Sequence, residues 1–341
     1  MSKVKAKKKR VVKRDTIVKR VVRTVVAVLA LYVFTTLMIT VNDLVDMLDQ
    51  NAVSRDTELG QGRYNALLDE GAPAYYNIYT DAELGSDPDL EVVKLYHFPA
   101  PSGERTPFAI VLPGGGYYEC DINKVGLPTA AALNDLGYSA FVLSYRYGKY
   151  SSKYAPLDDM ARAVEYILDH ADMFNVDASN YAVYGYSAGG NLAGLFAGEQ
   201  LGYARYGLPQ PSAVILAYPW ININGDIPLT GNMWQEAVQG VSQLIGNNYL
   251  LGSLFPSASE RDSVCVQNHV TPAYPKTYIM HGDNDFVVPL EQNSLVMKEA
   301  LDKNGVENYL RIAEGVNHGC GLGIGTSAEG WVAESVRFWI N

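Results

Sequence analysis

Short apolar runs alternate with longer amphipathic segments from residue 74 onward. We expect strands at eight runs rich in β-branched and aromatic residues, which cover residues 75–79, 91–98, 108–113, 139–145, 181–185, 213–219, 276–282 and 309–315. Helical patterns cover residues 127–137, 155–171, 187–202, 289–305 and 328–340. This alternation predicts an α/β protein with an eight-stranded, mostly parallel sheet and helices on both faces.

Two stretches depart from the alternating pattern. Residues 220–270 mix Gly, Asn and Ser with a little helical pattern. We expect them to form an irregular insertion over one edge of the sheet, within a single domain that covers residues 74–341. Residues 43–73 are polar and acidic and end in DEGAP, which predicts a linker with some helix.

A continuous apolar run lies close to the N-terminus. It reads TVVAVLALYVFTTLMITVN, covers residues 24–42 and has no charged side chain between Arg23 and Asp43. As a helix, this run would span roughly 28 Å, which matches the hydrocarbon thickness of a bilayer. We therefore expect one transmembrane helix that serves as an uncleaved signal anchor. A cleaved signal peptide, for which no small-residue cleavage site follows, and a buried helix are the alternatives.

Charge is divided unevenly along the chain. The net charge is −10, yet residues 1–23 hold eleven Lys and Arg and a single acidic residue, Asp15. Because this basic tail precedes the apolar run, the positive-inside rule places it in the cytoplasm and the acidic remainder outside the cell membrane. A basic segment beside a membrane span is suited to lipid headgroups, so we expect no nucleic-acid partner.

The sequence YGYSAGG, residues 184–190, follows the fifth apolar run and precedes a helical segment. Glycine inside a strand or helix costs about 0.5–1 kcal/mol relative to alanine, so three glycines here need a reason. A G-x-S-x-G sequence between a strand and a helix is typical of a sharp turn that exposes a nucleophilic serine, here Ser187. The alternative is a glycine-rich structural turn.

A serine nucleophile needs a base and a carboxylate that orients the base. Of the five histidines, His318 lies in a loop after the last expected strand. Because functional groups collect beyond the carboxyl ends of parallel strands, we expect His318 to be the base rather than a structural loop residue. The sequence HGDNDFVVP offers two acids after the preceding strand. We expect Asp285 to orient His318 and Asp283 to stabilise the turn.

A glycine-rich loop, LPGGGYYEC at residues 112–120, follows the third expected strand. Consecutive glycines allow backbone N–H groups to point into one space, where such donors stabilise a developing oxyanion. The loop has neither the Lys-Ser/Thr ending of a P-loop nor a G-x-G-x-x-G dinucleotide sequence, so no nucleotide cofactor is expected. The alternative is a flexible surface loop.

The three cysteines, Cys120, Cys265 and Cys320, show no metal-ligand spacing, and no metal site is expected. We expect thiols that pack as small apolar groups. The alternative is a disulfide between Cys120 and Cys320, which an oxidising exterior would permit.

These motifs together resemble the α/β-hydrolase fold, in its esterase and lipase branch, over about residues 90–340. The sequences that are similar to the acetyl-xylan and feruloyl esterase-like group are PGGGY (113–117), PLDDMARAVEYI (156–167), YGYSAGGNLA (184–193), HGDNDFVVP (281–289) and NHGCG (317–321). Pro113 stands where many lipolytic relatives carry a histidine. This departure argues against a hormone-sensitive lipase.

The resemblance also implies roles for individual residues. It implies a catalytic triad in the chain order Ser187, Asp285, His318. It further implies that the backbone N–H groups of Gly115, Gly116 and Ala188 form the oxyanion hole. Neither a metal nor an organic cofactor is implied.

The residues and the resemblance together predict a membrane-anchored serine ester hydrolase that uses an acyl-enzyme. Its substrates would be short acyl esters, among them acetylated or feruloylated carbohydrate. Aromatic residues expected at the rim of the site are Tyr117, Tyr118, Trp220, Trp234 and Tyr249. One alternative is a serine peptidase of the prolyl-oligopeptidase type, although too few residues precede the domain for its usual propeller. The other is a surface binding module on an inactive hydrolase fold, against which the complete triad argues.

Overall fold

A computed structural model describes residues 50–151, 153–225 and 233–341 of the chain. The basic tail at residues 1–23, the apolar run at 24–42 and part of the insertion lie outside the described residues. Within the described ranges, no helix is both long enough and apolar enough to cross a membrane. The signal anchor therefore stays a prediction.

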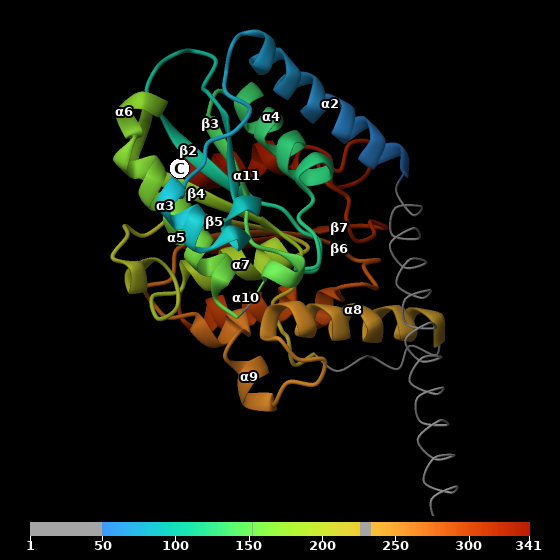
Figure 1. Cartoon of the computed structure of the whole chain (residues 1–341). Helices are drawn as coiled ribbons and strands as arrows, with labels where there is room; N and C mark the ends of the chain where they lie inside the picture. Colours follow the sequence, from blue (N-terminus) through green and yellow to red (C-terminus); the bar gives the residue numbers. More distant parts are fainter. Residues whose placement is uncertain (1–49, 152, 226–232) are drawn as a thin grey trace, which may run out of the picture. The chain divides into compact units, whose positions relative to one another are not determined.

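Seven strands form one sheet in the described part of the chain (Figure 1). They are β1 (Lys94–Phe98), β2 (Thr106–Leu112), β3 (Ser139–Ser144), β4 (Val176–Tyr186), β5 (Ala213–Ala217), β6 (Lys276–Gly282) and β7 (Asn308–Ala313). Their order across the sheet is β1-β3-β2-β4-β5-β6-β7. Strand β1 is antiparallel to β3, and the other neighbouring strands are parallel. The carboxyl ends of β2 to β7 therefore share one edge of the sheet.

The expectation of an eighth strand at residues 75–79 is wrong. Tyr76 makes only an isolated antiparallel bridge to Leu95 of β1. The chain cannot extend this pairing because Thr80 and Glu83 form a capping box that starts a helix at Asp81.

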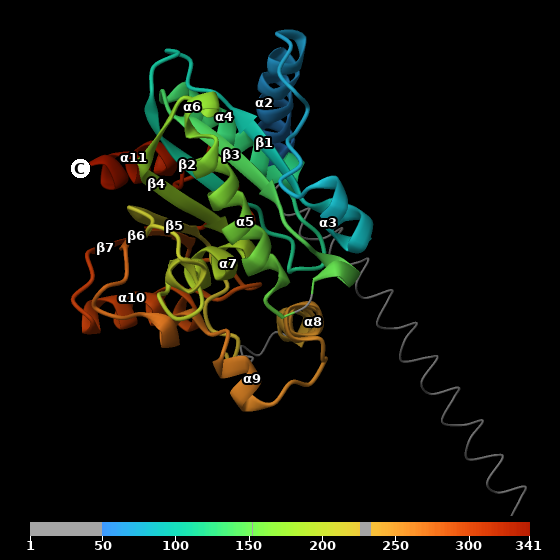
Figure 2. The same ribbon diagram turned by 60° about the vertical axis from the view of Figure 1, so that its left-hand side comes forward.

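Helices lie on both sides of the sheet (Figures 1 and 2). They are α2 (Gln50–Asp69), α3 (Asp81–Ser86), α4 (Leu127–Asp135), α5 (Ala155–Asp169), α6 (Ala171–Phe174), α7 (Ala188–Ala197), α8 (Met233–Leu251), α9 (Ala258–Asp262), α10 (Ser294–Lys303) and α11 (Trp331–Ile340). Helices α5, α7 and α10 pack against one face and α2, α4 and α11 against the other. Each face of the sheet thus carries an apolar core, the first with α5, α7 and α10 and the second with α2, α4 and α11. Strand β2 contributes to both, since Phe108 and Ile110 point into the first core and Ala109 and Val111 into the second.

Residues 50–69, expected within a linker, instead form a helix that packs on the domain. Leu67 is buried in the second core. A Cβ atom on Gly60 would lie 2.4 Å from the backbone nitrogen of Pro128, so α2 approaches the start of α4 very closely. The Nε of Arg63 donates to Asn134 at 2.9 Å. Some helix was expected in this stretch, but its packing against the domain depends on partners distant in the sequence, such as Pro128 and Asn134.

The insertion at residues 220–270 is more regular than expected. It holds the 19-residue helix α8 and the short helix α9. Gln239 of α8 donates to the carbonyl of Phe286 at 2.6 Å, and Gln243 donates to that of Gly225 at 3.0 Å. Since Gly225 follows β5 and Phe286 follows β6, α8 lies over the carboxyl ends of these strands.

A buried ion pair joins the segment after β3 to α5. Asp159 is fully buried and accepts hydrogen bonds from the backbone N–H of Arg146 at 2.8 Å and from Tyr79 Oη at 2.7 Å. An Arg146 guanidinium nitrogen lies 2.9 Å from its carboxylate. Removing one partner leaves the other charge buried without compensation, which is strongly destabilising.

We expect Asp159→Ala to lower the free energy of unfolding by about 3–5 kcal/mol, measured by urea denaturation of the full chain. The matched control is Asp169→Ala at the exposed end of the same helix, for which a change within about 0.5 kcal/mol is expected. Equal effects of the two substitutions would contradict a stabilising role for the buried pair.

Candidate active site

Ser187 lies at the sharp turn between β4 and α7. Its backbone has φ 52° and ψ −117°, a strained conformation for a non-glycine residue. Its N–H donates to the carbonyl of Ala217 at the end of β5, at 3.1 Å. A Cβ atom on Gly189 would lie 2.2 Å from the carbonyl oxygen of Leu112, and one on Gly185 would lie 2.4 Å from that of Gly189. The glycines are therefore required by close backbone packing around Ser187.

The structure brings Ser187, His318 and Asp285 together at one edge of the sheet. His318 Nε2 lies 3.0 Å from Ser187 Oγ, and His318 Nδ1 lies 2.7 Å from Asp285 Oδ2. An ionised carboxylate can only accept, so Nδ1 carries the imidazole proton. Nε2 is then the unprotonated nitrogen and accepts the hydrogen bond of the serine hydroxyl. This is the arrangement in which a histidine can remove the serine proton.

Asp285 is held in a buried network of donors. Its Oδ1 accepts from the backbone N–H groups of Val287 and Val288 at 2.9 and 2.8 Å. Its Oδ2 also faces Nε2 of His281, at 3.1 Å. Burial alone would raise the pKa of Asp285, but His318 and His281 together hold that pKa well below its usual range. The carboxylate therefore stays ionised, and its contribution to stability is lost only as the pH falls through this lowered pKa.

Asp283 occupies a different environment from Asp285. It is exposed, and its Oδ1 accepts from the backbone N–H of Gly315 at 2.6 Å. Its own N–H donates to the carbonyl of Ala313 at 3.0 Å. Asp283 thus ties the loop after β6 to the loop after β7.

The glycine-rich loop after β2 packs directly on the serine turn. A Cβ atom on Gly114 would lie 3.1 Å from the Cβ of Ser187. The carbonyl of Gly114 accepts from Asp121, and that of Gly115 accepts from Tyr118 and Glu119. In a trans peptide the N–H points opposite to the carbonyl, so the next N–H groups, of Gly115 and Gly116, point out of this turn.

Ala188 is the first residue of α7. The carbonyl of Ser187 accepts from Gly190 and Asn191 within the helix, so the N–H of Ala188 points out of the helix at its N-terminus. The positive end of the helix dipole lies there, beside the serine hydroxyl. Gly114, which the sequence analysis did not single out, is the loop residue that contacts Ser187.

The expectation that Tyr117 lies at the rim of the site is wrong. Its side chain is buried, with a relative exposure of 1%. Its Oη donates to Asn191 Oδ1 at 2.9 Å, and Asn191 Nδ2 donates to the carbonyl of Val264 at 3.0 Å. The side chain therefore fastens the glycine-rich loop to α7. Its position in a run of glycines and aromatics suggested an exposed side chain, whereas its hydroxyl has a buried partner in Asn191 and its ring packs against Tyr145.

Tyr118 and Tyr249 form an aromatic pair that joins the glycine-rich loop to α8. Tyr118 is 43% exposed, and the two ring centroids are 5.4 Å apart. Trp220 lies between the serine turn and α8: its N–H donates to the carbonyl of Ser187 at 3.0 Å, and its ring contacts Gly246. The side chain of Trp234 lies outside the described residues.

Two further residues support the site and were missed in the sequence. Tyr218 follows β5, and its ring packs edge-on against His318 with centroids 4.9 Å apart. His281 ends β6, and its Nε2 faces both Asp285 and the carbonyl of Val288, the latter at 2.8 Å. Its Nδ1 lies 2.6 Å from Ser294 Oγ. Both residues stand at strand ends, which is the signal that could have found them.

No group of His, Cys, Asp and Glu side chains suited to a metal ion occurs among the residues that the structure describes. The three cysteines are present as thiols, so the structure lacks the alternative disulfide between Cys120 and Cys320. Burial raises the pKa of the Cys120 thiol, which keeps it protonated and unreactive.

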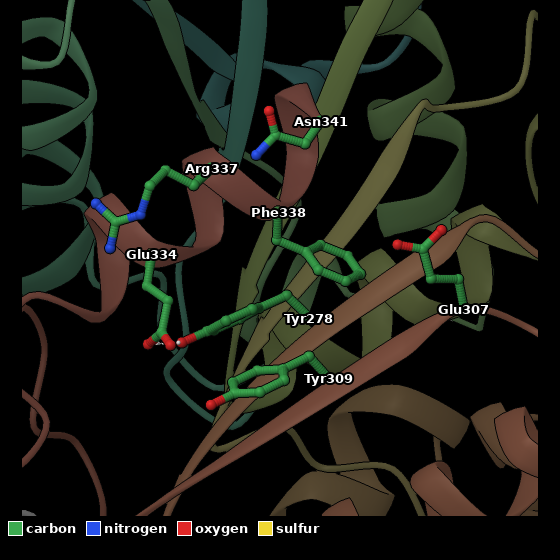
Figure 3. Close-up of a pocket in the computed structure, with 7 residues that line it drawn as sticks. All are labelled: Tyr278, Glu307, Tyr309, Glu334, Arg337, Phe338 and Asn341. Atoms are coloured by element: carbon green, nitrogen blue, oxygen red, sulfur yellow. Dashed lines mark hydrogen bonds between the residues drawn. The ribbon is translucent and has the colours of Figure 1, made fainter.

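A surface cavity of about 470 Å³ lies elsewhere on the domain (Figure 3). Its lining residues are Tyr278, Glu307, Tyr309, Glu334, Arg337, Phe338 and Asn341. Glu307 precedes β7, and Tyr309 stands near its start, so the cavity lies towards the amino ends of β6 and β7. It is therefore separate from the edge of the sheet that carries Ser187.

Comparison with known proteins shows relatives that span much of the domain. Residues 95–301 match the BD-FAE family model. The acetylxylan esterase of Xylanibacter ruminicola is 27% identical over 65% of this chain and 42% of its own length. The endo-1,4-beta-xylanase B of Butyrivibrio fibrisolvens is 31% identical over 56% of this chain and 29% of its own length. The chain thus spans less than half the length of these curated relatives.

Solved structures share the same arrangement of sheet and helices. The acetyl ester-xyloside bifunctional hydrolase from Caldicellulosiruptor lactoaceticus has a TM-score of 0.62 and 27% identity, over 77% of this chain and 93% of that chain. The carboxylesterase Cest-2923 from Lactobacillus plantarum has a TM-score of 0.58 and 21% identity, over 72% of this chain and 90% of that chain. The fold is therefore the α/β-hydrolase fold. Because the family model matches more than half of its residues, the chain belongs to the BD-FAE family and is related to acetylxylan esterases.

Proposed function

We propose that the chain is a serine carboxylic-ester hydrolase. The observation that carries this proposal is the continuous path of hydrogen bonds from Ser187 Oγ through His318 to Asp285. In the first step, Ser187 Oγ attacks the acyl carbonyl carbon while His318 Nε2 takes the serine proton. Asp285 keeps the proton on Nδ1 and stabilises the imidazolium that forms. His318 then gives its proton to the departing alcohol, which leaves an acyl-enzyme.

The second half of the reaction repeats these steps with water. His318 removes a proton from a water molecule, whose oxygen attacks the acyl carbon, and the proton returns to Ser187 as the carboxylic acid leaves. In both halves, the oxyanion would be held by the N–H groups of Gly115, Gly116 and Ala188. Support comes from the outward direction of these N–H groups and from the contact between the loop and Ser187.

We further propose that the substrates are short acyl esters of carbohydrate. One relative is named acetylxylan esterase, and a similar solved structure is named an acetyl ester-xyloside bifunctional hydrolase. The similarity covers 93% of the chain in that solved structure. The exposed ring of Tyr118, paired with Tyr249 beside the glycine-rich loop, offers an aromatic surface of the kind that packs against a sugar ring. No observed feature favours the peptidase or the inactive binding module.

We also propose that residues 24–42 anchor the chain in the cell membrane, with the N-terminus in the cytoplasm and the catalytic domain outside. The support is the apolar length of this run and the eleven basic residues before it.

The first experiment tests the triad. Ser187→Ala should abolish labelling by a fluorophosphonate probe and hydrolysis of p-nitrophenyl acetate. Asp285→Asn should lower kcat on the order of 10⁴-fold, because His318 loses the partner that sets its tautomer. Asp283→Asn is the matched control on the same loop and should cost only about 1 kcal/mol of stability. Reversed phenotypes of the two Asn variants would show that the carboxylate is assigned wrongly.

The second experiment tests acyl preference with a series of p-nitrophenyl esters and with acetylated xylan. Rates should be highest for acetyl esters and fall steeply beyond about four acyl carbons, since each methylene contact changes the discrimination by ~1–3 kcal/mol. A rate that rises with chain length towards palmitate would identify a lipase and exclude the carbohydrate-ester proposal.

The third experiment tests topology. The full chain should remain in the membrane fraction after high-salt and carbonate washes, because an apolar span is not released by screening charge. Protease added to intact cells should reach the domain after residue 43. Recovery of the full-length chain from the soluble cytoplasmic fraction would contradict the anchor.

A further inference from the structure

Helix α2 contacts the loop that follows His318. Asp56 is 1% exposed, and its Oδ2 accepts from the backbone N–H of Leu322 at 2.8 Å. Arg55 Nη2 donates to the carbonyl of Ile324 at 2.9 Å. Helix α2 lies before residues 95–301, the segment that matches the family model. The contacted loop, residues 319–325, lies after that segment.

The contacted loop is rich in glycine. Four alternate residues are glycines in the left-handed region, with φ values of 80°, 54°, 68° and 82° at Gly319, Gly321, Gly323 and Gly325. A chain with so many glycines has many accessible backbone conformations, and ordering it costs more conformational entropy than ordering other residues. The loop is held partly by its own turns, in which the N–H of Gly323 donates to the carbonyl of Cys320 at 2.8 Å, and partly by contacts from outside.

Two of those outside contacts meet on the peptide between Gly321 and Leu322, and a third meets the preceding peptide. Trp331 Nε1 donates to the carbonyl of Gly321 at 3.0 Å, and the N–H of Gly321 approaches the Oη of Tyr218 at 3.4 Å. Asp56 Oδ2 accepts a hydrogen bond from the next backbone N–H, that of Leu322. Tyr218 also packs its ring against His318. Tyr218 thus contacts both the imidazole and this part of the loop.

Helix α2 is itself fixed, so it can act as a rigid support. Its close packing on Pro128 and the hydrogen bond from Arg63 to Asn134 hold its C-terminal half against α4. We propose that α2 holds the loop of His318 in its catalytic conformation, with Asp56 as the positioning residue and Arg55 as a second contact. In the sequence, α2 begins eight residues after the apolar run at 24–42.

This inference rests on the proposed function, and kinetics of the full chain test it. Asp56→Ala should lower kcat for p-nitrophenyl acetate about tenfold, with KM changed less than about twofold, because the substrate site stays formed while the base is misplaced. Asp56→Asn keeps an oxygen acceptor for the N–H of Leu322 and should restore most of the rate. The matched control is Glu58→Ala, an exposed acid on the same helix, which should leave both parameters unchanged.

Hydrogen exchange gives a readout that does not need activity. In Asp56→Ala, the amides of residues 319–325 should exchange faster, while those of β2 keep their protection. Should this variant fail to fold, Arg55→Ala should raise exchange at residues 322–325 and lower kcat about two- to threefold. Unchanged kcat and exchange would overturn the inference, as would a loss of protection spread evenly through the sheet. Activity that survives Ser187→Ala would instead overturn the proposed function and leave the exchange result standing.

Discussion

The close contact between the serine turn and the end of β2 is the constraint on which the site depends. Gly189 lies so near the carbonyls of Leu112 and Pro113 that a side chain could not fit between the two backbones. This contact forces Ser187 into a strained conformation and places its hydroxyl beside the glycine-rich loop. The side chain of Ser187 and the N–H groups of the glycine-rich loop are thus positioned by the same packing contact. The strain is stabilised by the two apolar cores that enclose β2 and β4.

The second requirement is a carboxylate that stays ionised where water is excluded. Burying Asp285 is unfavourable by itself, and the structure offsets this with two backbone N–H donors and two histidines. His281 differs from His318 in being completely buried. Its Nε2 lies close to the carboxylate of Asp285 and the carbonyl of Val288, and its Nδ1 lies close to Ser294 Oγ. It therefore acts as a fixed donor to Asp285, whereas His318 is free to exchange a proton with Ser187. Two histidines on one carboxylate have separate roles because their second nitrogens meet different partners.

Two helices outside the alternating strand–helix pattern complete the surroundings of the site. Helix α8 lies over the carboxyl ends of β5 and β6 and brings Tyr249 to Tyr118. Helix α2 packs in the second apolar core and contacts the loop after His318. Variation of such elements can change what the site accepts, or how firmly its base is held, without changing the triad.

The sequence by itself determined the parts of this protein that depend on local rules. Short continuous apolar runs that alternate with helical segments predicted a mostly parallel sheet. The glycines around Ser187 predicted a strained turn, and the order of strand ends placed Asp285 and His318 near it. Features that depend on contacts between residues far apart in the sequence were decided only by the tertiary structure. Residues 75–79 have strand composition, yet Thr80 and Glu83 start a helix that ends the pairing. Tyr117 reads as a surface aromatic, but Asn191, far along the chain, gives its hydroxyl a buried partner. Asp56 reads as one acid in a polar linker because its partner, the N–H of Leu322, lies 266 residues away and leaves no local pattern.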